Sequence, residues 1–142
     1  MLWDQGKRFG RALLLLSLCN VTGAAYADVL SSRDLPLTRQ ADDLLLQAVN
    51  LRLPRVEVNV NSEPGCNAAW DGTRLLLLSG NADCLPAVEV PDLVLHEYGH
   101  RVTQHLLGRA PLEQSVGEAL ADLFAALFST DSKIAEGFYP QR

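Results

Sequence analysis

The segment from Pro91 to Gly108 constrains the fold of this chain more than any other. Proline is favoured at the first position of a helix and glycine just past its end, so the segment predicts a helix ending at Leu107. His96 and His100 are four residues apart and therefore share one face of that helix, one turn from each other. The rest of the chain has to bury one side of this helix and leave the imidazoles accessible.

Two imidazoles at this spacing can bind one tetrahedral Zn²⁺, with nitrogens about 2.0–2.1 Å from the ion. Glu97, beside the first histidine, can take a proton from water and pass it to a leaving amine. The pattern His-Glu-x-x-His is a known zinc-peptidase signature. Alternatively, the histidines are ordinary surface residues. Two features favour metal binding: only three histidines occur in the chain, and the apolar residues 93–95 predict a largely buried helix.

A catalytic zinc needs a third protein ligand and an open fourth position. A second helix is predicted from Ser115 to Ser129, and its Glu118 is the candidate ligand. Asp122, one turn further, can accept the free ring N–H of a ligand histidine. Ser115–Glu118 also matches an S-x-x-E capping box, in which the glutamate returns to the helix N-terminus instead. Beside the histidine pair, zinc binding is the expected role, with one ion per chain. Gly99 costs about 1 kcal/mol inside a helix, which close packing or metal access would offset.

Residues 1–27 are typical of a secretory signal: basic residues precede a short apolar run, and Ala25–Ala27 forms a small-x-small cleavage site. We expect residues 28–142 to form a single domain, secreted or periplasmic, without stable membrane insertion after cleavage. The apolar run is too short for a comfortable membrane anchor. Lipid attachment at Cys19 is disfavoured because the preceding Leu18 is bulky.

Cleavage would leave two cysteines, Cys66 and Cys84. In an exported protein they predict one disulfide, worth about 3 kcal/mol in the loop-entropy picture. Two free buried thiols are the alternative. Hydrophobic residues make up 48% of the chain and charged residues 20%, which is globular composition. A net charge of −5 argues against a nucleic-acid-binding surface.

The remaining segments predict an α+β fold. A helix is expected from Thr38, as its cap, to Leu51, and a half-buried strand over Val56–Val60. Asp71 and Gly72 predict a hairpin turn before a buried strand over Arg74–Ser79. The expected apolar side of the first helix comprises Ala41, Leu44, Leu45, Ala48 and Val49. In the C-terminal tail, Phe138 and Tyr139 are expected to return to the core.

Three segments of the chain resemble those that build the active site of thermolysin-like peptidases. Residues 92–103 (DLVLHEYGHRVT) are similar to the active-site helix of that family, and residues 117–124 (GEALADLF) to its glutamate helix. Residues 67–73 (NAAWDGT) are similar to its Asn-Ala-x-Trp edge-strand segment. The chain therefore resembles the gluzincins, the zinc peptidases with a His/His/Glu ligand set.

The resemblance implies a role for each matching residue. His96, His100 and Glu118 would bind zinc, and Glu97 would be the general base and acid. Asp122 would orient a zinc-bound histidine, His96. The implied fold is a zincin-like core, in which a small mixed sheet packs on the HExxH helix and on the glutamate-bearing helix.

The resemblance also implies a substrate-binding strand. Asn67 and the main chain of Ala68 and Trp70 would hold an extended peptide or protein substrate by strand addition. Without the resemblance, Trp70 is equally well a core aromatic residue and Asn67 a turn residue.

The chain departs from the family pattern around the oxyanion. The loop over residues 108–114 lacks the family's tyrosine, and too few residues follow Glu118 for its C-terminal helical domain. One lost oxyanion donor typically costs about 10²–10³ in rate. His105 and Tyr139 are possible substitutes, although helix geometry predicts that His105 faces solvent. The chain thus resembles the minimal single-domain gluzincins.

The sequence therefore predicts an exported zinc peptidase. The rival hypothesis is a non-catalytic exported protein, in which zinc is a structural cross-link and the scaffold binds a partner. Retention of Glu97 favours the enzyme, because a structural site has no use for a base. The missing oxyanion donors favour the rival. A truncated gene product is a third possibility.

Overall fold

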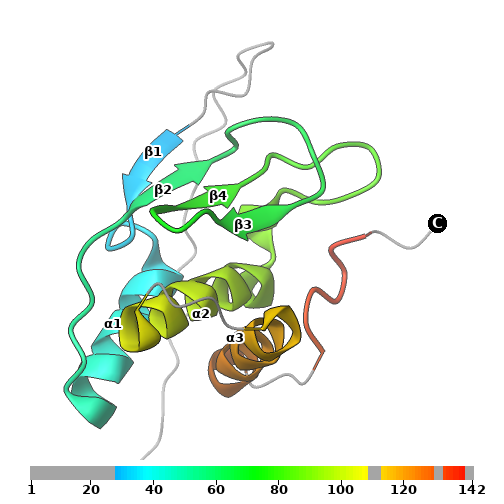
Figure 1. Cartoon of the computed structure of the whole chain (residues 1–142). Helices are drawn as coiled ribbons and strands as arrows, with labels where there is room; N and C mark the ends of the chain where they lie inside the picture. Colours follow the sequence, from blue (N-terminus) through cyan, green and yellow to red (C-terminus); the bar gives the residue numbers. More distant parts are fainter. Residues whose placement is uncertain (1–27, 109–112, 130–132, 140–142) are drawn as a thin grey trace, which may run out of the picture.

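The computed structural model describes residues 28–108, 113–129 and 133–139, so the expected signal over residues 1–27 lies outside the described residues. The described residues form a small α+β fold in which a four-stranded mixed sheet covers a layer of helices (Figure 1). The elements are, in chain order, β1 (Asp28–Ser31), α1 (Pro36–Val49), β2 (Glu57–Val60), β3 (Ala68–Trp70), β4 (Arg74–Leu77), the 3₁₀ helix η1 (Ala87–Glu89), α2 (Pro91–Leu107) and α3 (Gln114–Ser129).

The sheet has the strand order β1-β2-β4-β3, with β2 and β4 parallel and the two outer pairs antiparallel. The predicted alternation in β2 is confirmed, since Val58 and Val60 are buried. Leu75 and Leu77 of β4 are fully buried on the same side, and the predicted hairpin joins β3 to β4. Strand β1 was not predicted, because a four-residue edge strand depends on pairing with a segment about 30 residues away.

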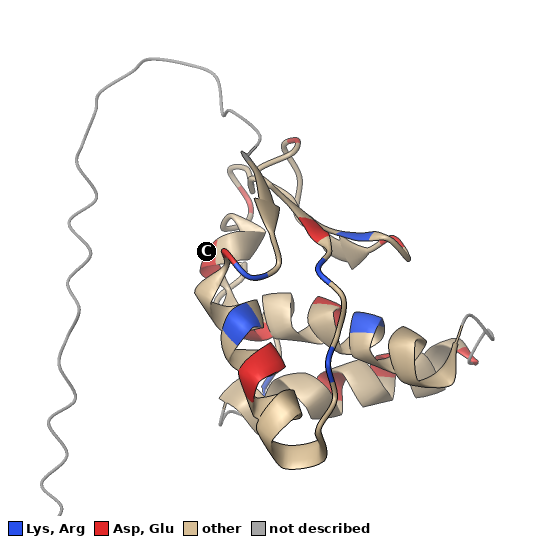
Figure 2. Ribbon diagram, turned by 90° about the vertical axis from the view of Figure 1, so that its left-hand side faces the viewer, with Lys and Arg blue, Asp and Glu red and all other residues tan. Residues whose placement is uncertain are grey.

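Helix α2 runs from Pro91 to Leu107, as predicted, and α3 begins one residue before the predicted start. Figures 1 and 2 show α2 between the sheet and α3, with α3 lying alongside it. Val94, Tyr98 and Val102 of α2 are buried in one core cluster with residues of the sheet. None of the helices in the described part of the chain has the length and apolarity needed to cross a membrane.

The prediction for α1 was partly wrong. Thr38 is not the helix cap, because the helix begins two residues earlier at Pro36. The Thr38 side chain is fully buried, and its hydroxyl, with one proton to donate, lies within hydrogen-bond distance of the Ser32 carbonyl and of the more distant Leu35 carbonyl. It therefore ties the first turn of α1 to the end of β1.

The expected apolar side of α1 is buried only in part. Ala41 is fully buried and Leu45 packs against the core, but Leu44 is 41% exposed and Val49 67% exposed. Ala48 is also exposed. The sequence periodicity marked these residues correctly as one side of a helix, but only part of that side meets the sheet and α2.

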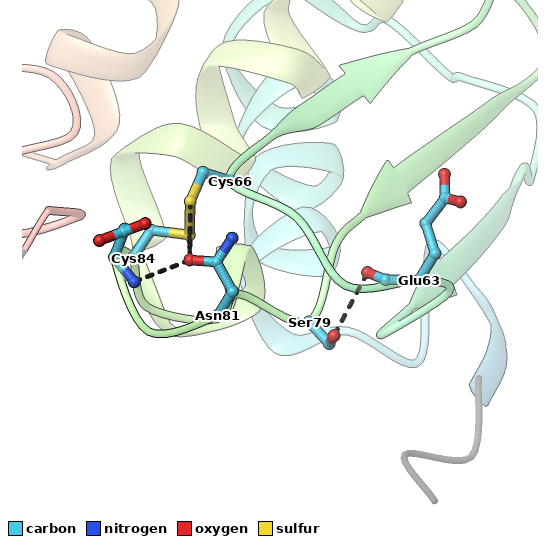
Figure 3. The surroundings of a disulfide bond; sticks show 6 residues. Glu63, Cys66, Ser79, Asn81 and Cys84 are labelled. Atoms are coloured by element: carbon cyan, nitrogen blue, oxygen red, sulfur yellow. Dashed lines mark hydrogen bonds between the residues drawn. A yellow bond between two sulfur atoms is a disulfide. The ribbon is translucent and has the colours of Figure 1, made fainter.

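The disulfide between Cys66 and Cys84 is confirmed, with Cα atoms 5.6 Å apart (Figure 3). It joins the segment before β3 to the segment before η1. Phe138 of the C-terminal tail is buried against Cys84 and Val90, as expected, and its carbonyl accepts the N–H of Leu85 at 2.9 Å. Tyr139 instead is 58% exposed.

Candidate metal and catalytic site

Helices α2 and α3 bring two imidazoles and a carboxylate together. His96 Nε2 lies 3.2 Å from His100 Nε2 and 3.1 Å from Glu118 Oε2, and His100 Nε2 lies 3.6 Å from the same oxygen. The donor atoms of His96, Glu97 and His100 also lie within 4.8 Å of one another. These residues could therefore hold a metal ion.

Asp122 fixes the orientation of the first imidazole. Its Oδ1 lies 2.8 Å from His96 Nδ1, on the opposite side of the ring from the Glu118 contact. A carboxylate in this position favours the tautomer with the proton on Nδ1, which leaves Nε2 with a free lone pair. The capping-box alternative for Glu118 is not what the structure shows, since its carboxylate contacts both imidazoles.

Gly99 allows the two helices to come this close. A Cβ atom at this position would lie 2.9 Å from the Cα of Ala121 and 3.0 Å from the Cβ of Phe124, both on α3. Real Cβ contacts are essentially never that short. The sequence left close packing and metal access as reasons for a glycine inside this helix, and the structure confirms close packing.

Glu97 lies beside the imidazoles and faces β3. Glu97 is 8% exposed, and its Oε2 accepts the backbone N–H of Trp70 at 2.8 Å. Burial raises the pKa of the Glu97 carboxyl above its ordinary value, although His96 and the Trp70 N–H oppose the shift. A carboxylate with a raised pKa is a stronger base for abstracting a proton from water.

Burial, with a contribution from the neighbouring His96, lowers the pKa of His100 below its ordinary value. A lowered pKa keeps the imidazole neutral near pH 7. Only a neutral imidazole has the lone pair that a metal ion requires.

A groove of about 830 Å³ runs along β3 above these side chains. All three predicted substrate-binding residues, Asn67, Ala68 and Trp70, line it, together with Glu97, His100 and Glu118. Among the described residues, the lining comprises Asn67, Ala68, Ala69, Trp70, Asp71, Gly72, Thr73, Glu97, His100, Thr103, Gln104, Leu107, Gly108, Gly117 and Glu118.

Strand β3 forms the edge of the sheet and offers backbone groups to the groove. The carbonyl of Asn67 accepts the N–H of Leu78, just after β4, and the N–H of Asp71 donates to the carbonyl of Arg74 in β4. Because backbone groups alternate along a strand, those of Ala68 and Trp70 point to the open edge. The Trp70 N–H is already bonded to Glu97, so the structure leaves fewer groups free for strand addition than the sequence suggested.

A buried polar network behind the site was missed from the sequence. Arg101 is only 3% exposed, donates to the Tyr98 hydroxyl and to the Pro54 carbonyl, and lies 3.8 Å from Asp42. Tyr98 in turn donates to Asp42 of α1. The signal was available: Arg101 follows Val94 and Tyr98 at helical spacing on the buried face, where an arginine requires partners.

Gln104 was also missed, although its position four residues after His100 places it on the face of α2 that lines the groove. The two suggested oxyanion substitutes do not line the groove: His105 is exposed, as predicted, and Tyr139 is mostly exposed.

No protein-family model matches the chain, and no curated protein matches it significantly.

Proposed function

We propose that this protein is an exported zinc peptidase of the gluzincin type, with one Zn²⁺ held by His96, His100 and Glu118. The observation that carries the proposal is the triangle of donor atoms across α2 and α3, with sides of 3.1, 3.2 and 3.6 Å. Ligand atoms about 2.0–2.1 Å from a tetrahedral ion lie about 3.3 Å apart. Two imidazoles and one carboxylate are also a donor set that catalytic zinc uses.

When bound, zinc supplies a Lewis acid that polarises the scissile carbonyl and acidifies water. Glu97 takes the proton from the attacking water and delivers it to the leaving amine. The Trp70 N–H holds one carboxylate oxygen, so the other is free to face the reacting atoms. Asp122 keeps the His96 ring oriented throughout.

The substrate in this proposal is an extended peptide or protein segment lying along β3. The outward backbone groups of Ala68 and the Trp70 carbonyl are available for strand addition, and Asn67 also lines the groove. Among the described residues, the charged side chains lining the groove are Asp71, Glu97 and Glu118, and Arg74 donates a hydrogen bond to Asp71.

Two features support export of the protein to a secreted or periplasmic location. The N-terminal segment over residues 1–27 has the pattern of a secretory signal. The Cys66–Cys84 disulfide is the type of bond that persists in oxidising compartments.

The test is a metal analysis combined with digestion of a peptide library by the disulfide-bonded protein. We expect one zinc per chain and cleavage of internal peptide bonds. Glu97→Gln should abolish cleavage and keep the zinc, because it removes the base and leaves the ligands. Glu89→Gln is the matched control, since Glu89 is exposed on η1 and does not line the groove.

The non-catalytic alternative has a distinct outcome. A wild-type protein that binds zinc but cleaves nothing in the library would support a zinc-stabilised binding protein. A protein purified without transition metal, and unable to take zinc up, would contradict both functions.

A further inference from the structure

The Gln104 side chain connects α2 to the tip of the β3–β4 hairpin. Its Oε1 accepts the indole N–H of Trp70 at 2.6 Å, and its Nε2 donates to the Gly72 carbonyl at 3.2 Å. Both bonds join residues more than thirty positions apart in the chain. The side chain thus bridges the end of β3 and the turn that follows it.

The hydrogen bonds within the hairpin tip, residues 71–74, fix its local conformation, but they do not attach it to α2. Asp71 accepts hydrogen bonds from Thr73 and Arg74, and Gly72 takes a left-handed conformation with φ 94°. Within the described residues, two side chains of α2, Gln104 and Glu97, form the hydrogen bonds that attach this end of the hairpin to the helix.

Strand β3 depends on such attachment. It has three residues and pairs only with β4, so its other edge is unsupported within the sheet. Trp70 attaches the strand to α2: its backbone N–H donates a hydrogen bond to Glu97, and its indole N–H donates one to Gln104. A hydrogen bond weakens steeply with misalignment, so the Trp70–Glu97 bond requires a well-positioned strand.

We propose that Gln104 is a positioning residue of the site: it holds the edge strand against α2, so that the Trp70 N–H orients the Glu97 carboxylate. This role rests on the proposed peptidase function, because Glu97 is the base in that reaction. Gln104 acts through Trp70 and does not itself touch the reacting atoms.

Gln104 also lines two cavities. A second pocket of about 310 Å³ is lined in part by Pro54, Val56 and His105, which do not line the main groove. Trp70, Gly72, Thr73 and Gln104 line both this pocket and the main groove. The bridge between Gln104 and Trp70 therefore belongs to the lining that the two cavities share.

The test compares Gln104→Met, which keeps the side-chain length without either hydrogen bond, with Gln104→Glu, which keeps the acceptor for the indole N–H and loses the donor. Gln47→Met is the matched control, because Gln47 is exposed on α1. The first readout is hydrogen exchange of the Trp70 backbone amide by NMR in zinc-free protein, and it requires no activity. The others are zinc affinity and kcat and KM for a cleaved library peptide.

We expect Gln104→Met to speed exchange of the Trp70 amide at least about tenfold and to lower kcat roughly 10–100-fold, the size of effect that misplacement of a catalytic group gives. Zinc affinity should stay unchanged, since the three ligands are untouched. Gln104→Glu should fall between Gln104→Met and wild type. Trp70→Phe combined with Gln104→Met should cost less than the sum of the two single changes, because both remove the same Trp70–Gln104 hydrogen bond.

The outcomes separate this proposal from the peptidase function. If Gln104→Met shows wild-type exchange at Trp70, or wild-type kcat, the positioning role is wrong. If the wild-type protein cleaves nothing, the peptidase function is wrong, and amide exchange alone decides whether Gln104 holds the strand.

Discussion

Replacing Gly99 with alanine tests whether the α2–α3 crossing sets the metal site. The added Cβ would lie 2.9 Å from the Cα of Ala121 and 3.2 Å from its carbonyl oxygen. Non-bonded carbons normally lie about 3.5–4.0 Å apart, so α3 has to retreat by roughly 0.6–1.1 Å. Because the obstacle is backbone, no side-chain rotation relieves it.

Two effects on stability oppose each other. Alanine is favoured over glycine inside a helix by about 1 kcal/mol, whereas overpacking typically costs about 1–3 kcal/mol. We expect Gly99→Ala to lower the free energy of unfolding by about 1 kcal/mol. Gly117→Ala is the matched control on α3: a Cβ there meets nothing within 4 Å, so the same change should stabilise by about 0.5–1 kcal/mol.

We expect zinc affinity to respond to Gly99→Ala more strongly than the free energy of unfolding does. Donor distances in a metal site tolerate deviations of about 0.2 Å, so a retreat of α3 should pull Glu118 and Asp122 out of position and weaken zinc binding at least about tenfold. Urea unfolding of the metal-free protein and zinc titration measure the two effects separately. If Gly99→Ala is as stable as Gly117→Ala and binds zinc like wild type, close helix contact does not control the site.

Other substitutions test the remaining parts of the structure. His100→Ala should lower zinc content from one ion per chain to nearly none in metal analysis, whereas His105→Ala, which removes an exposed histidine of the same helix, should leave it unchanged. Asp122→Asn should weaken zinc binding by roughly tenfold, measured by competition with a chelator, because the imidazole loses its charged partner; unchanged affinity would contradict an orienting role. Replacing Cys66 and Cys84 together with alanine should lower the free energy of unfolding by about 3 kcal/mol, measured by urea denaturation without reductant. A loss below about 1 kcal/mol would show that this segment is constrained by its packing instead.

Much of the fold follows from local patterns in the chain. The bounds of α2 follow from Pro91 and from the glycine after Leu107. The alternation of β2 and the turn at Gly72 are equally local, and both agree with the structure. Thr38 shows the opposite case: its side chain suits a cap by type, but the preceding Pro36 starts the helix earlier, and the hydroxyl bonds instead to the carbonyl of Ser32, just after β1.

In the candidate site too, some features follow from local sequence patterns and others only from tertiary packing. The face shared by His96 and His100 is a property of one helix and could be read from their spacing. The position of Glu118 required a second helix, and its sequence allowed either a cap or a metal ligand. The contacts of Gln104 and Arg101 were not predicted, because each joins segments that lie far apart in the chain.

The sequence by itself determined the elements and the donor types, because helix and strand periodicities depend on neighbouring residues. It placed His96, Glu97 and His100 on one helix before any packing was known. The tertiary structure decided how close α3 comes at Gly99, and hence whether Glu118 reaches the imidazoles. It also decided that the Trp70 N–H meets Glu97. These distances arise from the packing of surfaces that are distant in the chain, and local patterns do not specify how such surfaces fit together.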